Sequence, residues 1–143
     1  MPTYANGPIP ALPIGGGGVA FVSALPGEMV LRQQVAPTAY TTTATITAAE
    51  LATRVLTVTN AGSITITLPT AALLDTYMPN AQLNDSIDFS IVNLGAGTWT
   101  LAGGTGVTTV GTMTTATATA TMFRLRKTNA PGATSAWVVY RVG

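Results

Sequence analysis

The chain has 143 residues and a formal net charge of +1, and charged residues make up only 8% of it, against about 25% in an average globular protein. It contains no cysteine and no histidine, which excludes a disulfide framework, a thiol nucleophile and the commonest catalytic base. The near-neutral charge argues against nucleic-acid binding. With so few charges to oppose association, we expect a subunit that its neighbours cover. A monomer with an unusually threonine-rich surface is the alternative.

Residues 1–40 are expected to form an extended N-terminal arm. They carry six of the nine prolines and a run of four glycines, which disfavour regular structure. The arm is nevertheless apolar, whereas disordered tails are normally polar. We therefore predict that it orders along a partner, with a flexible leader as the alternative. The candidate partner-binding side chains are Ile9, Leu12, Ile14, Phe21, Leu25, Met29 and Leu31.

Residues 41–143 are expected to form one domain of short strands. A β-prone run begins near Tyr40, and Thr47 and Glu50 then fit a capping box that starts a short helical turn. The later elements are a hairpin with arms 55–60 and 63–68, a helix over 71–78 with Leu73, Leu74 and Tyr77 on its buried side, a hairpin over 84–101, strands over 105–110 and 112–121, and strands over 122–129 and 136–142 that flank a turn cluster at 129–132.

The hairpin over 84–101 has the clearest pattern. Ile87, Phe89 and Ile91 alternate with polar residues, and Trp99 continues the alternation after a glycine turn. Eight or nine such strands at close spacing are typical of a sandwich. We therefore predict an all-β fold, an antiparallel β-sandwich or jelly roll of about eight strands with one or two short helices.

The ionisable residues do not suggest catalysis. Asp85 and Asp88 are three positions apart on a predicted strand, which places them on opposite faces. A calcium site that uses Asp75 and Asp85 remains open, although the dense acidic spacing of a calcium loop is missing. Arg124 and Arg126 share one strand face and form a small basic stripe. We expect no enzyme, no cofactor and no bound metal.

The aromatic residues admit two interpretations. Trp99 and Trp137 lie in alternating apolar runs, where core packing is the favoured role. With Tyr77 and Tyr140 they could instead form a platform that stacks on sugars. No uninterrupted apolar stretch is long enough to span a membrane.

Five segments of the sequence resemble structural proteins of tailed bacteriophages, most nearly the jelly-roll head-decoration, or cement, proteins. They are ITLPTAALL (66–74), NDSIDFSIVN (84–93), LAGGTGV (101–107), FRLRKTN (123–129) and VVYRVG (138–143). The resemblance implies a homotrimer on the outer capsid surface of the virion, whose arm or base bridges copies of the major capsid protein and stabilises the shell. It transfers no catalytic residue.

Two other functions are weighed against this one. A receptor- or glycan-binding module of a tail fibre or spike would use exposed aromatic side chains. A glycan-cleaving enzyme is the weakest reading, because no pair of acids converges.

Overall fold

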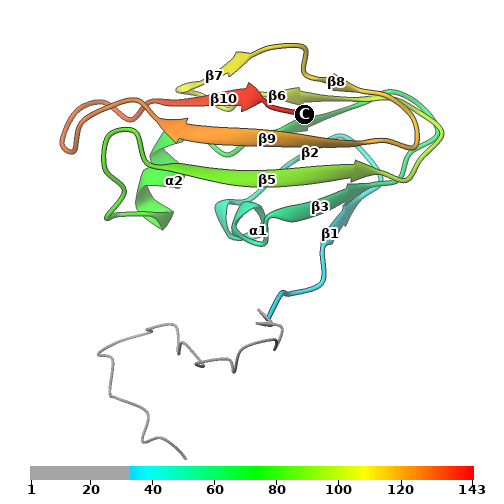
Figure 1. Cartoon of the computed structure of the whole chain (residues 1–143), viewed down its shortest axis with the longest axis horizontal. Coiled ribbons are helices and arrows are strands. Elements are labelled where there is room, and N and C mark those ends of the chain that lie inside the picture. The colour runs from blue at the N-terminus through cyan, green and yellow to red at the C-terminus, as the bar shows by residue number, and fades with distance from the viewer. Residues whose placement is uncertain (1–32) are drawn as a thin grey trace, which may run out of the picture. The chain divides into compact units, whose positions relative to one another are not determined.

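The computed structural model describes residues 33–143, so the seven partner-binding candidates of the predicted arm lie outside the described residues. Residues 34–143 belong to one compact unit, which includes the last residues of the predicted arm range. Its elements in chain order are β1 (Thr38–Tyr40), β2 (Ala44–Thr45), α1 (Ala48–Ala52), β3 (Val55–Val58), β4 (Ile64–Thr67), α2 (Ala71–Tyr77), β5 (Ser86–Asn93), β6 (Trp99–Ala102), β7 (Val107–Val110), β8 (Thr114–Thr115), β9 (Ala120–Lys127) and β10 (Trp137–Arg141) (Figure 1).

The strands form two mixed sheets. The larger has the order β1-β3-β5-β9-β10-β7 and the smaller the order β2-β4-β6-β8. Five of the eight described strand pairs are parallel, and three are antiparallel. The predicted antiparallel sandwich or jelly roll is therefore wrong. The four parallel pairs among β1 to β6 arise because the chain crosses to the other sheet after each strand and then returns, so that successive strands of one sheet run in the same direction.

The first six strands form three stacked coils, each with one strand in either sheet. The coils consist of β1 with β2, β3 with β4, and β5 with β6. Val58 pairs with Asn93 and Ile64 pairs with Trp99, in both cases 35 positions further along the chain. Because the offset is the same in both sheets, the turns inside the second and third coils have equal lengths and lie against each other.

Asparagine side chains hold these turns. Asn60 Oδ1 accepts a hydrogen bond from the Gly62 amide at 2.7 Å, and Asn60 Nδ2 donates to the carbonyl of Thr41 in the first coil. A Cβ at Gly97 in the third coil would overlap the carbonyl of Gly62. Glycine is therefore required at position 97 for the two turns to approach this closely.

Asn93 makes the corresponding contacts in the third coil. Its Oδ1 accepts from the Gly95 amide at 3.1 Å, and its Nδ2 donates to the carbonyls of Gly97 at 2.8 Å and Ala116 at 2.9 Å. Asn93 is only 2% exposed, so these bonds satisfy an amide that would otherwise be buried without partners.

Both predicted hairpins are wrong. The arms predicted over 55–68 are β3 and β4, and those predicted over 84–101 are β5 and β6. In each case the two strands lie in different sheets. Each arm buries one face whether its successor lies beside it or across the core, so the alternation of side chains is the same in both cases. The predicted turn cluster at 129–132 does separate two strands, β9 and β10, which pair antiparallel. The predicted strand over 112–121 is reduced to β8 and the start of β9.

Aromatic residues join the two sheets through the core. Trp99 of the smaller sheet is fully buried and meets Phe123 of the larger sheet edge-on, with ring centroids 5.9 Å apart. Phe123 also stacks on Phe89 at 5.4 Å. Trp137 is 2% exposed. The predicted core roles of both tryptophans are confirmed.

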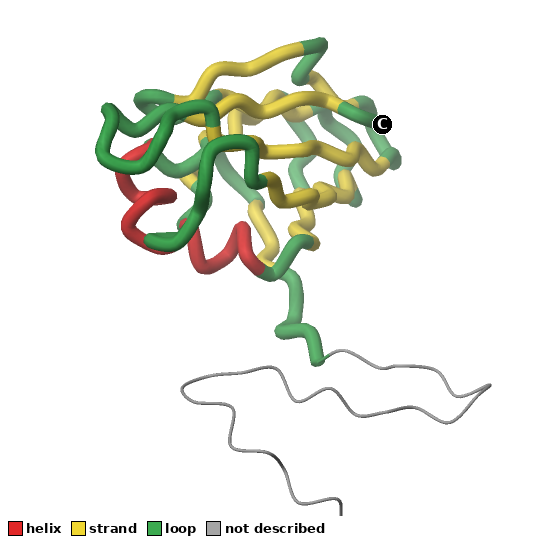
Figure 2. Tube along the Cα trace, turned by 60° about the vertical axis from the view of Figure 1, so that its left-hand side comes forward, coloured by secondary structure: helices red, strands yellow, loops and turns green. Residues whose placement is uncertain are grey.

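The two short helices lie on the same side of the strands and contact each other (Figure 2). The predicted capping box of Thr47 and Glu50 begins α1, and Thr70 caps α2. Leu74 is buried as predicted, but Leu73 and Tyr77 are 57% and 49% exposed. That part of the prediction is wrong because α2 is short and buries only the stripe that contains Ala71 and Leu74.

Neither described helix has the length and apolar character that a membrane-spanning helix requires.

Candidate functional site

Asp75 joins three elements through one carboxylate oxygen. Its Oδ1 accepts a hydrogen bond from Lys127 Nζ at the end of β9 and another from Trp137 Nε1 at the start of β10, both at 2.8 Å. The Lys127 side chain is only 6% exposed, and its ammonium group lies 5.7 Å from the centroid of the Trp137 ring. The cluster therefore fastens α2 to two adjacent strands of the larger sheet, β9 and β10.

The protonation of Asp75 follows from these neighbours. Partial burial acts to raise the pKa of Asp75, but the hydrogen bonds from Lys127 and Trp137 and the charge of Lys127 outweigh it and hold the pKa below its usual value. Asp75 is therefore a carboxylate at neutral pH, and its partners are structural groups of the fold.

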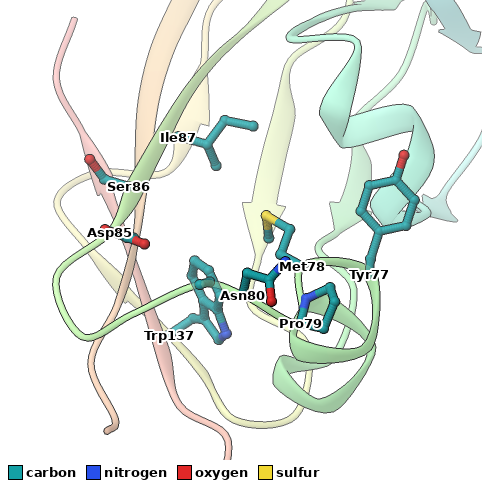
Figure 3. Close-up of a pocket in the computed structure, with 9 residues that line it drawn as sticks. Tyr77, Met78, Pro79, Asn80, Asp85, Ser86, Ile87 and Trp137 are labelled. Atoms are coloured by element: carbon teal, nitrogen blue, oxygen red, sulfur yellow. The ribbon is translucent and has the colours of Figure 1, made fainter. Parts of the chain in front are cut away.

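An open cleft of about 500 Å³ lies beside this cluster, between the end of α2 and the start of β5 (Figure 3). Trp137 forms part of its wall, and Tyr77 stands on the other side of it. Asp85 lies in the turn before β5, where its Oδ2 accepts from the Gln82 amide at 2.8 Å. The two aromatic rings do not form one platform, and the carboxylate is engaged by the backbone.

The positions of Asp75 and Asp85 do not support a calcium site. Asp75 is committed to Lys127 and Trp137, and Asp85 to its own turn. Between residues 33 and 143 there is no group of three or more histidine, cysteine, aspartate or glutamate side chains that could hold a metal ion.

The predicted basic stripe lies on the outer face of the larger sheet, opposite the buried Phe123 and Leu125. Arg124 binds Asp88 of β5 in a bidentate pair, with Nε to Oδ1 at 2.7 Å and a second nitrogen to Oδ2 at 2.8 Å. The hydrogen bonds from Arg124, together with its charge, lower the pKa of Asp88. The sequence could not reveal this pair, because it depends on the register of β5 against β9.

Arg126 is also engaged within the chain. It donates to Asn84 Oδ1 at 2.6 Å and to the Tyr140 hydroxyl at 2.8 Å, and its guanidinium lies 5.7 Å from the centroid of the Tyr140 ring. The stripe is therefore a row of partnered side chains that adds structure to this sheet face.

The outer face of the smaller sheet was not singled out from the sequence. We call it the threonine face, because outward-facing threonines from adjacent strands form rows across it. Thr65, Thr100 and Thr114 are neighbours by strand register, and Thr43 joins them because its hydroxyl accepts from the Thr65 amide at 3.2 Å. The face consists of Thr43, Thr45, Thr65, Thr67, Thr100 and Thr114.

The threonine face is uncharged and uncovered by the described residues. β2, β4, β6 and β8 contain no ionisable residue, and all six threonines are partly or fully exposed. The signal in the sequence is the motif threonine-any residue-threonine, which occurs at 43–45, 65–67 and 98–100 and also at several positions outside this face. The motif forms a surface only because the coils bring these segments side by side.

An apolar groove adjoins this face. It has a volume of about 550 Å³ and runs between α1 and α2, where Thr45 of the threonine face lines it together with Ile46, Leu73 and Tyr77. The exposed Leu73 and Tyr77 side chains thus continue the surface that the threonines begin.

No protein-family model, curated protein or solved structure matches this chain. Any functional conclusion therefore depends on the sequence and on the geometry described above.

Proposed function

We propose that this chain is a viral structural protein, a decoration subunit that binds the outside of a capsid and stabilises the shell through contact area. The observation that carries the proposal is the threonine face, a sheet surface whose strands hold no ionisable residue and which residues 33–143 leave uncovered. Broad neutral surfaces of this kind suit permanent contacts between proteins better than the binding of small charged ligands.

The disposition of the polar groups agrees with this role. Asp75, Asp88, Arg124 and Lys127 all bind one another or neighbouring side chains inside the fold. A catalytic site needs groups that converge on a substrate and are free to exchange protons with it. The described residues instead use their charges to hold strands and a helix together.

The proposal assigns the attachment to the capsid to residues 1–32, whose apolar composition suits binding along a partner surface. The partner is the major capsid protein of the same particle. Apolar area removed from water contributes about 25 cal/mol per Å² before the cost of association, so an arm of this composition would supply a large part of the affinity.

The test compares the full chain with a chain that lacks residues 1–32. Each is mixed with undecorated shells, and the amount that sediments with the shells is measured. We expect the truncated protein to keep its circular dichroism spectrum and to lose shell binding. Undiminished binding by the truncated protein would show that the arm is not the attachment element.

Imaging of purified particles at subunit resolution tests the location. We expect density for this chain on the shell. A position at the tail tip would favour the receptor-binding module instead, although the burial of Trp99 and Trp137 removes them from any sugar-stacking platform.

A further inference from the structure

We propose that the threonine face, together with the adjoining groove, is a self-association surface on which the same surface of a second copy packs about a two-fold axis. The inference rests on the proposed structural role and names the contact between subunits. It replaces the three-fold contact that the sequence resemblance implied with a two-fold one.

The hydrogen-bonding chemistry of the face matches itself. A hydroxyl group both donates and accepts, whereas a guanidinium only donates and a carboxylate only accepts. A two-fold contact brings a patch against its own copy, so a patch of hydroxyls can satisfy every group it buries. No hydrogen bond within residues 33–143 engages the hydroxyls of Thr65 and Thr67 at the centre of the face, which leaves them available to a partner.

The distribution of charge selects this face over the other. The outer face of the larger sheet carries Arg124 and Arg126 against the single acid Asp88. Pairing that face with its own copy would bring an excess of positive charge together, which disfavours association. The four strands under the threonine face contain no ionisable residue. Arg141 reaches the carbonyls of Thr112 and Thr114 at the β8 end of the face, so self-pairing about the central Thr65 and Thr67 meets no such repulsion.

The groove supplies the apolar part of the contact. Leu73 and Tyr77 are 57% and 49% exposed, although both are large and apolar and lie on a helix whose other side is buried in the core. Aromatic and aliphatic anchors of this kind dominate the energy of interfaces, while polar contacts around them set the register. Thr45 lines the groove and also belongs to the face, so the two parts form one continuous surface.

The test measures the mass of the full chain by sedimentation over a wide range of concentrations. We expect a dimer for the natural sequence. Thr65→Lys and Thr65→Glu should each weaken the dimer about tenfold or more, because each places two like charges near the two-fold axis. An equimolar mixture of the two variants should recover the dimer, because the charges are then opposite.

Thr108→Lys is the matched control, because Thr108 is an exposed threonine on the outer face of the larger sheet. It should leave the dimer unchanged. Circular dichroism and the emission of the buried tryptophans show whether each variant is folded. Leu73→Glu, on the helix, should weaken the dimer without touching a strand.

A natural sequence that stays monomeric at every concentration overturns the inference, as does a dimer that survives both Thr65→Lys and Leu73→Glu. The shell-binding measurement separates this failure from failure of the proposed function. A monomer that still decorates shells refutes only the self-association surface, and a dimer that does not bind shells refutes only the capsid role.

Discussion

A single carboxylate, that of Asp75, decides how α2 is held. Lys127 lies 52 positions away in the sequence and Trp137 lies 62 positions away, and both reach the same oxygen. Because Lys127 is nearly buried, its charge depends on Asp75 for compensation. The sequence named Asp75 only as a candidate calcium ligand, since nothing local connects it to a lysine so far along the chain.

We expect Asp75→Ala to lower the free energy of unfolding by about 3–5 kcal/mol, because it leaves a buried lysine without a partner. Denaturation by urea, followed through tryptophan emission, measures the loss.

Asp88→Ala is the matched control at the protein surface. It breaks the pair with Arg124, in which the Asp88 side chain is 41% exposed and the Arg124 side chain 51% exposed. The free energy of unfolding should therefore fall by about 1 kcal/mol or less. Equal losses for the two variants would contradict the importance assigned to the buried pair.

The turns inside the coils are the elements that the sequence reveals least. It correctly predicted which side chains of 84–101 face inward, since Phe89, Ile91 and Trp99 are all buried. It could not say whether Trp99 lies in the same sheet as Phe89 or in the facing one, because the alternation has period two in both arrangements. The difference is made by the contact of one turn on the next, which is a long-range property.

That contact gives a sharp prediction for the glycines. Gly97→Ala should lower the free energy of unfolding by about 3 kcal/mol or more, because the added methyl group overlaps backbone atoms of the neighbouring turn and the coils must separate. Thermal unfolding monitored by circular dichroism measures the effect.

Gly62→Ala in the neighbouring turn is the control. A Cβ at Gly62 would approach only Asn60 Oδ1, at 3.5 Å, which is ordinary contact. This variant should therefore unfold close to the temperature of the natural sequence. Similar behaviour of the two alanine variants would contradict the close stacking of the turns.

At the scale of the whole molecule, the positions of the strands were predicted better than their pairing. Most predicted strand segments contain a strand, and both helices lie where their caps placed them. The direction of pairing was wrong because hydrophobic patterns record burial and say little about which strand lies alongside. The threonine face could not be predicted for the same reason, because its threonines become neighbours only when the strands of the smaller sheet pair in register.

Three carboxylates determine how the stability of the whole molecule depends on pH. Partial burial acts to raise the pKa of Glu50, but hydrogen bonds from the backbone and hydroxyl of Thr47 outweigh it. The pKa values of Glu50, Asp75 and Asp88 therefore all lie below their usual values. In the unfolded chain the same groups titrate at about pH 4. Around and below that pH the unfolded state therefore binds more protons than the folded state.

These three carboxylates should consequently contribute fully to the free energy of unfolding above about pH 5. That contribution should be lost as the pH falls through their lowered pKa values in the folded state. Urea titrations at a series of pH values measure this. Asp75→Asn should make the decline shallower, because it removes one of the titrating groups. A free energy that stays constant down to about pH 2 would show that the folded-state pKa values are not lowered.

The coils place their two kinds of connection at opposite ends. β3 and β5 point toward the packed turns, while α1 and α2 lie at the other end of the strands (Figure 1). The packed turns leave no room for extra residues, but the segment 79–83 after α2 is largely exposed and is not part of a strand. A foreign peptide inserted there would project from the molecule without disturbing the register of any coil, which makes this segment the natural place to attach a displayed antigen or label.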